Sequence, residues 1–243
     1  MLPQALHRHA AQYRALHRAR YDRLGDFLEL AYCAVARQTA DAPRAELLEA
    51  RYMRVVRHYL ADDIRTLPKL LAFLQLALTD GGCDFLGNVA TDMGVLDGKA
   101  GQFFTPYHLA RMMAEMTLMD ADRVIAERGF LTMSEPACGA GCMSVAAADV
   151  LADAGYDVGQ VLYMEVTDLS PFAFKMAYLQ LSARGIPALV HHGNTLSDEC
   201  FEAAYTPAMA SFLALHREAY VRWREEARPA EPAAQVGGQL LLL

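Results

Sequence analysis

The chain has 243 residues, of which 54% are hydrophobic and 21% are charged, and its formal net charge is −7. This length suffices for one or two domains with a normal core, and the composition excludes a disordered or collagen-like chain. No apolar run is long enough for a transmembrane helix, and the polar, basic first residues do not resemble a signal peptide. We therefore expect a cytoplasmic protein without a membrane partner.

Charge is distributed unevenly along the chain. Residues 1–69 contain twelve Lys and Arg against eight Asp and Glu, whereas the remainder is strongly acidic. A basic N-terminal third suits contact with a polyanion, although a solvated helix face explains the same pattern and is the interpretation we favour. The negative total argues against a chain that wraps nucleic acid unaided.

The chain has five cysteines, and no two of them form a Cys-x-x-Cys pair. The two closest are four residues apart, without histidine partners nearby. This spacing predicts free thiols in a reducing compartment and no metal site. The cysteines are Cys33, Cys83, Cys138, Cys142 and Cys200.

Helices are predicted throughout the first third of the chain. Apolar residues recur there at three- and four-residue intervals, as in Leu24, Phe27 and Leu28. Pro43 suits the start of a second helix, and Pro68 precedes a third. The expected helices cover residues up to about 31, then 44–60, 69–78 and a short stretch after Asp84.

After residue 101 the pattern changes to alternating strands and helices. A helix at 109–119 is followed by short apolar strands at 129–135, 158–168 and 188–192, with helices at 139–151 and 171–184 between them. This alternation is typical of parallel βαβ units. Beyond Leu196 the sequence predicts one or two helices over 201–228 and a frayed tail, but no further strand.

The sequence thus predicts an α/β fold in which a helical N-terminal part packs on a partial Rossmann-like sheet. The expected parts are a helical region at 1–98, a ligand-binding domain at 99–205, and a C-terminal helix and tail at 206–243. A complete doubly wound sheet has about six strands, and this chain supplies about three of them.

A glycine-rich loop lies between the first predicted strand and the helix that follows it. Gly139 and Gly141 fit the first two positions of G-x-G-x-x-G, and Ser144 stands at the third. Glycines at these positions permit a tight turn and a close approach of the backbone to a ligand. A strand-to-helix turn without any ligand explains such a loop equally well.

Polar residues follow the next two predicted strands. Asp168, at the tip of the second strand, suits both ribose hydroxyls of an adenosine or the N-cap of the helix at Pro171, and one residue can do both. Glu165 is the rival acid, but it falls inside the strand. Asn194 follows the third strand and suits an adenine amino group, or else an ordinary turn. Because the carboxyl ends of parallel strands meet at one edge, the sequence predicts a nucleotide-like ligand there.

A second motif, Gly101-Gln-Phe-Phe-Thr-Pro-Tyr107, precedes the helix at 109–119. Pro106 forces Thr105 into extended backbone, and Thr105 is a natural N-cap, so this motif alone predicts only helix capping. Followed in order by Glu-Pro-Ala-Cys-Gly-Ala-Gly, it resembles the M subunits of type I restriction–modification systems and related N6-adenine DNA methyltransferases. The resemblance covers residues 101–196.

The resemblance implies a class I methyltransferase fold with S-adenosylmethionine as cofactor and DNA as partner. It implies that Glu135 lies near the cofactor ammonium group and that Asp168 binds the ribose. Asn194 stands where relatives often have Asp beside the adenine, and it keeps a carbonyl acceptor. The implied cofactor-binding residues are Phe104, Thr105, Pro106, Glu135, Pro136, Ala137, Gly139, Gly141, Asp168 and Asn194.

The sequence departs from this family at the catalytic motif. Relatives hold the amino group of a flipped adenine with Asn/Asp/Ser-Pro-Pro-Tyr/Phe, the kind of grip that base chemistry requires. This chain contains no Pro-Pro dipeptide, so it resembles a truncated member of the family. The nearest substitute is Tyr205-Thr-Pro207, with Tyr205 and Pro207 as candidate catalytic residues. A turn between helices is the interpretation we favour for this segment.

The family function is N6 methylation of adenine in DNA, and two hypotheses about this chain remain open. One is an enzyme or enzyme subunit whose acceptor pocket comes from a partner chain or from an unrecognised local sequence. The other, which the missing motif favours, is a non-catalytic cofactor-binding homologue that modulates a restriction–modification system through partner binding. The strand ends alone also allow an adenosine-containing ligand other than S-adenosylmethionine.

Overall fold

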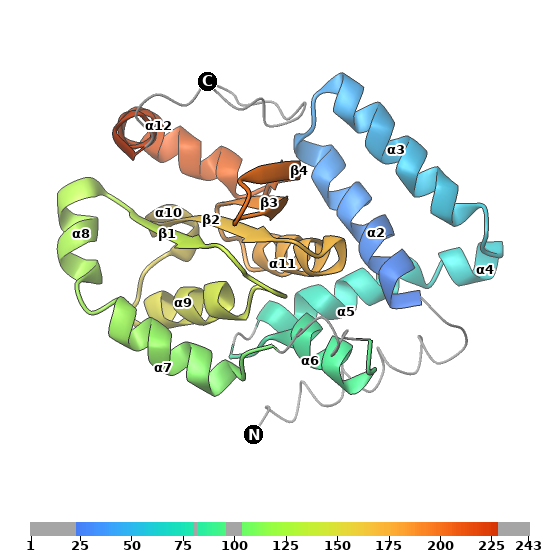
Figure 1. Cartoon of the computed structure of the whole chain (residues 1–243), viewed down its shortest axis with the longest axis horizontal. Coiled ribbons are helices and arrows are strands. Elements are labelled where there is room, and N and C mark those ends of the chain that lie inside the picture. The colour runs from blue at the N-terminus through green and yellow to red at the C-terminus, as the bar shows by residue number, and fades with distance from the viewer. Residues whose placement is uncertain (1–22, 80–81, 96–103, 228–243) are drawn as a thin grey trace.

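The computed structural model describes residues 23–79, 82–95 and 104–227 of the chain (Figure 1). Its sheet has four strands in the order β1-β2-β3-β4. The strands are β1 (Leu131–Glu135), β2 (Leu162–Asp168), β3 (Ala188–Asn194) and β4 (Glu199–Tyr205). The first three strands are parallel, and β4 is antiparallel to β3. The predicted α/β fold with a partial Rossmann-like sheet is therefore confirmed.

The described helices are α2 (Arg23–Ala36), α3 (Ala42–Val56), α4 (Ala61–Ile64), α5 (Leu67–Thr79), α6 (Phe85–Asp92), α7 (Tyr107–Thr117), α8 (Ala121–Arg128), α9 (Cys142–Asp153), α10 (Val158–Val161), α11 (Pro171–Ala183) and α12 (Met209–Ala227), with a 3-10 turn at Arg37–Thr39. Helices α9 and α11 cover one face of the sheet, and α12 covers the other (Figure 1). Helices α5, α6 and α7 form an outer layer beyond α9 and α11. No helix in the described ranges has the length and apolar character that a bilayer span needs.

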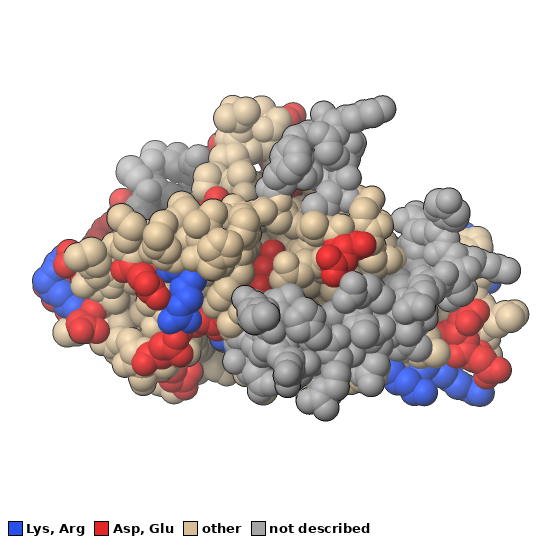
Figure 2. Space-filling view, turned by 90° about the horizontal axis from the view of Figure 1, so that it is seen from below, with Lys and Arg blue, Asp and Glu red and all other residues tan. Residues whose placement is uncertain are grey.

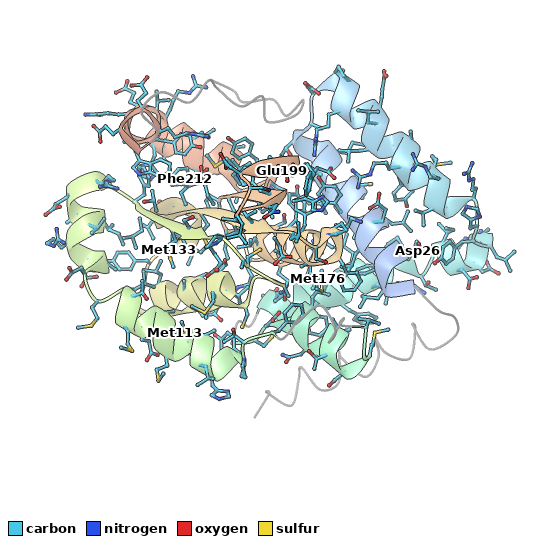
Figure 3. All side chains as sticks on the ribbon, in the orientation of Figure 1. Asp26, Met113, Met133, Met176, Glu199 and Phe212 are labelled. Atoms are coloured by element: carbon cyan, nitrogen blue, oxygen red, sulfur yellow. The ribbon has the colours of Figure 1, made fainter. Side chains whose placement is uncertain are left out.

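Strand β2 illustrates how the sheet is buried on both faces. Leu162, Met164 and Val166 belong to the core shared with α11, whereas Tyr163 belongs to the cluster under α12. Phe212 of α12 lies between that helix and the sheet, with its ring centroid 5.9 Å from that of Tyr163 (Figure 3). Parallel strands that are covered on both faces have nearly continuous apolar sequences, and this pattern allows the strand to be predicted from the sequence.

Most predicted elements are confirmed within a few residues. The helices expected at 44–60, 69–78, after Asp84, at 109–119 and at 171–184 are α3, α5, α6, α7 and α11. Strands β1, β2 and β3 lie within or over the three strands expected. Residues 1–22 and 228–243, which hold the start of the first predicted helix and the predicted tail, lie outside the described residues. The domain limits at 98 and 205 stay a prediction, and the core contains residues of α2, α5 and α6 together with residues of β2 and β3.

The segment after Leu196 is the main correction. Residues 199–205 form β4, where the sequence predicts a helix from residue 201. A turn with Asp198 at a φ of 55° joins this strand to β3, and the pairing register shifts between His192 and Gly193. The strand has no alternating apolar pattern, and only its last three residues are buried. Its conformation therefore depends on pairing with β3, which no local pattern reveals.

Smaller boundaries also differ from the prediction. Residues 158–161 form α10 rather than the start of a strand. Helix α9 begins at Cys142 rather than at Gly139. Gly139 and Gly141 both adopt the left-handed conformation, and a right-handed helix cannot include residues in that conformation. Helices α4 and α8 lie where the sequence predicts no element.

Four basic residues of the described first third pair with acids, namely Arg37, Arg44, Arg51 and Arg65. Between residues 23 and 69, Lys and Arg exceed Asp and Glu by only one, and the rest of the excess lies in residues 1–22, outside the described ranges. Figure 2 shows Lys and Arg interspersed with Asp and Glu over the described part of one face. This arrangement favours paired, solvated helix faces over a basic surface in that region.

One network of ion pairs holds α2 and α3 against β4 and α11. Arg51 donates to Glu29 at 2.7 and 3.1 Å and to Glu202 at 2.8 Å. Arg44 donates to Glu202 at 3.1 Å, and Lys175 Nζ lies 2.7 Å from a Glu29 oxygen. The five side chains are between 12% and 26% exposed. These charges are partly desolvated, so breaking the network costs more than breaking an exposed pair.

The Glu29 carboxyl should make the fold sensitive to acid. Burial alone would raise its pKa, but hydrogen bonds from Arg51 and Lys175 outweigh burial and lower the pKa from 4.5 to about 2. A depressed folded-state pKa stabilises the fold above the unfolded value and loses that contribution as pH falls from about 4.5 toward 2, an effect of about 3 kcal/mol. Urea unfolding should therefore show a stability difference between wild type and Glu29→Gln that shrinks between pH 6 and pH 3.

The matched control for this experiment is Glu49→Gln. Glu49 pairs with Arg37 at 3.2 Å, but the two side chains are 47% and 55% exposed. An exposed pair contributes little, so this variant should follow wild type across the same pH range. A Glu29→Gln deficit that stays constant with pH would show that packing, and not the ionised carboxylate, carries the effect.

Candidate functional site

The glycine loop runs from the end of β1 to the start of α9. Gly139 has a φ of 55° and Gly141 a φ of 94°, which L side chains rarely adopt. A Cβ built on Gly139 would lie 3.0 Å from the Phe104 ring, and one on Gly141 would lie 3.4 Å from Ala177 Cα of α11. Both glycines are therefore required by backbone conformation, and Gly139 also by close packing.

The motif before α7 lies directly against this loop. The Phe104 ring packs on Gly139, and the Cys142 thiol donates to the Thr105 carbonyl oxygen at 3.3 Å. The N-cap of α7 is Pro106 and has no side-chain cap hydrogen bond, so the prediction that Thr105 caps the helix is wrong. Residues 101–103 of the motif lie outside the described ranges. The structure thus joins two motifs that are far apart in the sequence.

Asp168 holds the loop from the end of β2. Its Oδ2 accepts from the Gly139 N–H at 2.8 Å, and its Oδ1 accepts from the Ser170 N–H at 2.8 Å. The N-cap of α11 is Ser170, which accepts from the Ala173 N–H, so the alternative interpretation of Asp168 as the N-cap is wrong. Carboxylate oxygens have further lone pairs, so Asp168 can hold the loop and still accept from ligand hydroxyls.

The rival acid, Glu165, lies on the other side of β2. Its carboxylate accepts from the Tyr163 hydroxyl at 2.9 Å, and Tyr163 belongs to the cluster under α12. Alternate residues of a strand point to opposite faces, so Glu165 faces away from the side on which Asp168 meets the loop. Geometry therefore favours Asp168 as the acid of the site.

The end of β3 is tied to the same loop. The Thr195 hydroxyl donates to the Pro136 carbonyl oxygen at 2.6 Å, a contact that sequence reasoning missed because nothing local distinguishes this threonine. Asn194 Oδ1 accepts from the Leu196 N–H at 3.0 Å, so part of its acceptor capacity is used in a local turn. Glu135 is partly exposed and accepts weakly from the Ala137 N–H, at 3.4 Å.

Tyr205 and Pro207 are not brought to this site. Tyr205 ends the antiparallel strand β4 and pairs with Leu189, near the start of β3, whereas Asn194 ends β3 at the loop. At about 3.3 Å per residue, this separation along the strand is about 17 Å. Tyr205 is buried, and its hydroxyl accepts from Arg224 at 3.0 Å. These two residues therefore lie near the amino end of β3, whereas the glycine loop lies at the carboxyl ends of the parallel strands.

The thiols of the loop are protonated in this environment. Burial raises the pKa of Cys138 well above its usual value, and burial together with Asp84 raises the pKa of Cys142. All five cysteines are free, as predicted. A neutral thiol is a poor nucleophile, so the two loop cysteines contribute packing and weak hydrogen bonds.

The glycine loop, the acid after β2 and the motif before α7 meet at the carboxyl edge of the parallel strands, where Rossmann-like proteins bind their ligands. Residues 85–214 match the family model described as N-6 DNA Methylase, which spans more than half of the chain and includes every candidate site residue. The chain belongs to the N-6 DNA methylase family. No curated protein and no solved structure matches it.

Proposed function

We propose that the protein binds S-adenosylmethionine at the carboxyl edge of β1, β2 and β3. The observation that carries the proposal is that Gly139 directly contacts both Phe104 and Asp168. These three residues come from three separate segments of the chain. The family membership supports the choice of cofactor. The acidic and glycine positions suit an adenosine ligand, since an acid after the second strand can take ribose hydroxyls.

Each residue has a distinct part in this proposal. Glu135 and the motif at Phe104, Thr105 and Pro106 flank the methionine end, and the loop of Pro136, Ala137, Gly139 and Gly141 passes beneath the cofactor. Asp168 accepts from the ribose, and Asn194 lies beside the adenine. S-adenosylmethionine, when bound, supplies an activated methyl group. DNA as the acceptor, a restriction–modification context and a cytoplasmic location are parts of the same proposal.

Replacing Asp168 by Ala should weaken cofactor binding. Wild type should bind S-adenosylmethionine with micromolar affinity, about −8 kcal/mol. The variant loses an acceptor for two hydroxyls and the Gly139 anchor, a cost of about 1.5–3 kcal/mol, or about tenfold to a hundredfold in Kd. Isothermal titration calorimetry measures both, with Glu165→Gln as a control that should bind like wild type.

Two outcomes would contradict the assignment. Absence of heat from wild type at near-millimolar S-adenosylmethionine would remove the cofactor from the proposal. Unchanged affinity in Asp168→Ala, with loss in Glu165→Gln, would move the ribose contact to Glu165.

The second candidate function is a non-catalytic homologue that acts through a partner chain. The observation that favours it is the position of Tyr205 and Pro207, which removes the nearest substitute for the missing Pro-Pro motif from the cofactor edge. In addition, β1 pairs only with β2 among the described residues, and its other side is where a further strand would join the sheet. An enzyme subunit completed by a partner's acceptor pocket fits the same observations.

A further inference from the structure

A buried glutamine in α11 contacts the glycine loop and the helical N-terminal part at once. Gln180 is fully buried, and its Nε2 donates to the Ala140 carbonyl oxygen and to Asp84 Oδ1, both at 2.7 Å. Its Oε1 accepts from the Leu86 N–H at 3.0 Å. Both N–H bonds of the amide are therefore used, one on each side.

Asp84 completes this arrangement at the start of α6. It is 3% exposed and caps the helix by accepting from the Gly87 N–H at 2.9 Å. A Cβ on Gly87 would lie 2.0 Å from the Asp84 carboxylate, so the glycine makes room for it. Burial raises the pKa of Asp84, against hydrogen bonds from Gln180 and Gly87 that lower it. The carboxyl group is thus a buried partner for the Gln180 amide.

The carbonyl oxygen that Gln180 holds belongs to the loop residue between the two glycines. Ala140 stands between Gly139 and Gly141, and glycine backbones lose the most conformational freedom on ordering. The N–H of Gly141 donates to the Cys138 carbonyl oxygen at 2.8 Å, while the carbonyl oxygen of Ala140 accepts from Gln180. Both polar groups of the peptide between Ala140 and Gly141 are therefore fixed from the protein side.

We propose that Gln180 and Asp84 are positioning residues for the cofactor loop, which they hold in its ligand-binding conformation from the helical N-terminal part. This inference rests on the proposed function for its ligand, but the positioning itself concerns the chain alone. A site whose supporting hydrogen bonds are fixed before binding has less ordering to do when the ligand arrives. Loss of the Gln180 contacts should therefore reduce affinity without removing any group that touches the cofactor.

The test compares Gln180→Met with Thr206→Val. The first variant keeps the length and apolar bulk of Gln180 but removes its three hydrogen bonds. The second removes a buried hydroxyl that bonds to the Ala188 N–H and the Ile186 carbonyl oxygen, at the opposite end of the sheet. Both should lower the unfolding temperature, but only Gln180→Met should raise the Kd for S-adenosylmethionine, by about tenfold or more.

A second readout needs no cofactor. Cys138 is buried in the loop, so its alkylation by iodoacetamide, followed by mass spectrometry of the peptide, reports local opening of the loop. Gln180→Met should speed this reaction by about tenfold relative to wild type, while the buried Cys33 of α2 should react at an unchanged rate. Thr206→Val should leave both rates unchanged.

Asp84→Ser keeps the test decisive if Gln180→Met does not fold. Serine still caps α6 but is too short to reach Gln180, whereas Asp84→Asn keeps an acceptor and should behave like wild type. Faster Cys138 alkylation in Asp84→Ser and rescue in Asp84→Asn are expected. Folded Gln180→Met and Asp84→Ser variants with wild-type Cys138 rates would overturn the proposal. If wild type binds no S-adenosylmethionine, the proposed function is refuted. The Cys138 alkylation rates then still test whether Gln180 and Asp84 position the loop.

Discussion

The purified chain alone should transfer no detectable methyl group to DNA, although it should bind S-adenosylmethionine. Methylating adenine N6 requires the base to be out of the stack, gripped along its edge and held against the methyl group. Orientation of this kind supplies about 7–11 kcal/mol of the lowering of the barrier. Losing even half of it slows the reaction by more than about a hundredfold. The chain has no Pro-Pro motif to provide that grip.

The structure sharpens this expectation through Tyr205. The residue is buried and bonded to Arg224 at the edge of the sheet opposite the glycine loop, so it lies too far from the site to stack on an acceptor base there. Tyr205→Ala should therefore leave both cofactor binding and the absence of methyl transfer unchanged. A buried tyrosine is also a packing residue, so the variant's fold is checked by circular dichroism.

The measurement is transfer of a labelled methyl group from S-adenosylmethionine to DNA of mixed sequence, with N6-methyladenine identified by mass spectrometry. Product formed by wild type and lost in folded Tyr205→Ala would overturn the non-catalytic interpretation and our placement of Tyr205. Product formed equally by both would place an acceptor site elsewhere in the chain. Product that appears only when a partner chain is added would favour the enzyme-subunit hypothesis.

Replacing Asp149 by Ala should destabilise the fold by about 3–5 kcal/mol. The Asp149 side chain is 5% exposed and pairs with Arg184, which is 13% exposed. It also accepts from the Gly82 N–H at 2.7 Å and from the Tyr107 hydroxyl. Removing the carboxylate leaves a buried guanidinium without its charge partner, although Arg184 keeps its contact with the Leu78 carbonyl oxygen at 2.7 Å. The total free energy of unfolding of a typical domain is only about 5–15 kcal/mol.

Urea unfolding at neutral pH measures this effect, with Asp153→Ala as the matched control. Asp153 lies on the same helix and pairs with Arg111 at 2.6 Å, but its side chain is 65% exposed. The control should lose less than about 1 kcal/mol, because exposed ion pairs contribute little. Equal losses in the two variants would show that the buried pair is no more important than the surface pair.

The Asp149 variant bears on function through Tyr107. This residue begins α7 immediately after Phe104, Thr105 and Pro106, and its hydroxyl bonds to Asp149 on α9. The contact anchors the motif before α7 to the helix that follows the glycine loop. Folded Asp149→Ala protein should therefore also bind S-adenosylmethionine more weakly than Asp153→Ala protein.

Much of the fold and the cofactor site is readable in the sequence alone. Strand β2 is apolar on both faces and α11 begins at Pro171, so their conformations follow from local pattern. Gly139 and Gly141 can be identified in the sequence because glycine adopts a left-handed backbone at the lowest steric cost. Asp168 can be predicted as a site residue because it ends a parallel strand, and the carboxyl ends of parallel strands meet at one edge of the sheet.

Contacts between distant segments were decided only by the tertiary structure. The direction of β4 depends on a turn at Asp198 and on pairing with β3, and that direction alone carries Tyr205 away from the glycine loop. The role of the Gln180 amide was also decided only by the tertiary structure. In the sequence it is one polar residue in an apolar helix, and its contacts with α6 and the glycine loop appear only in the fold. Local periodicity records which face of an element is buried, whereas register and strand direction are set by free energies of contacts between elements, which no short window of sequence contains.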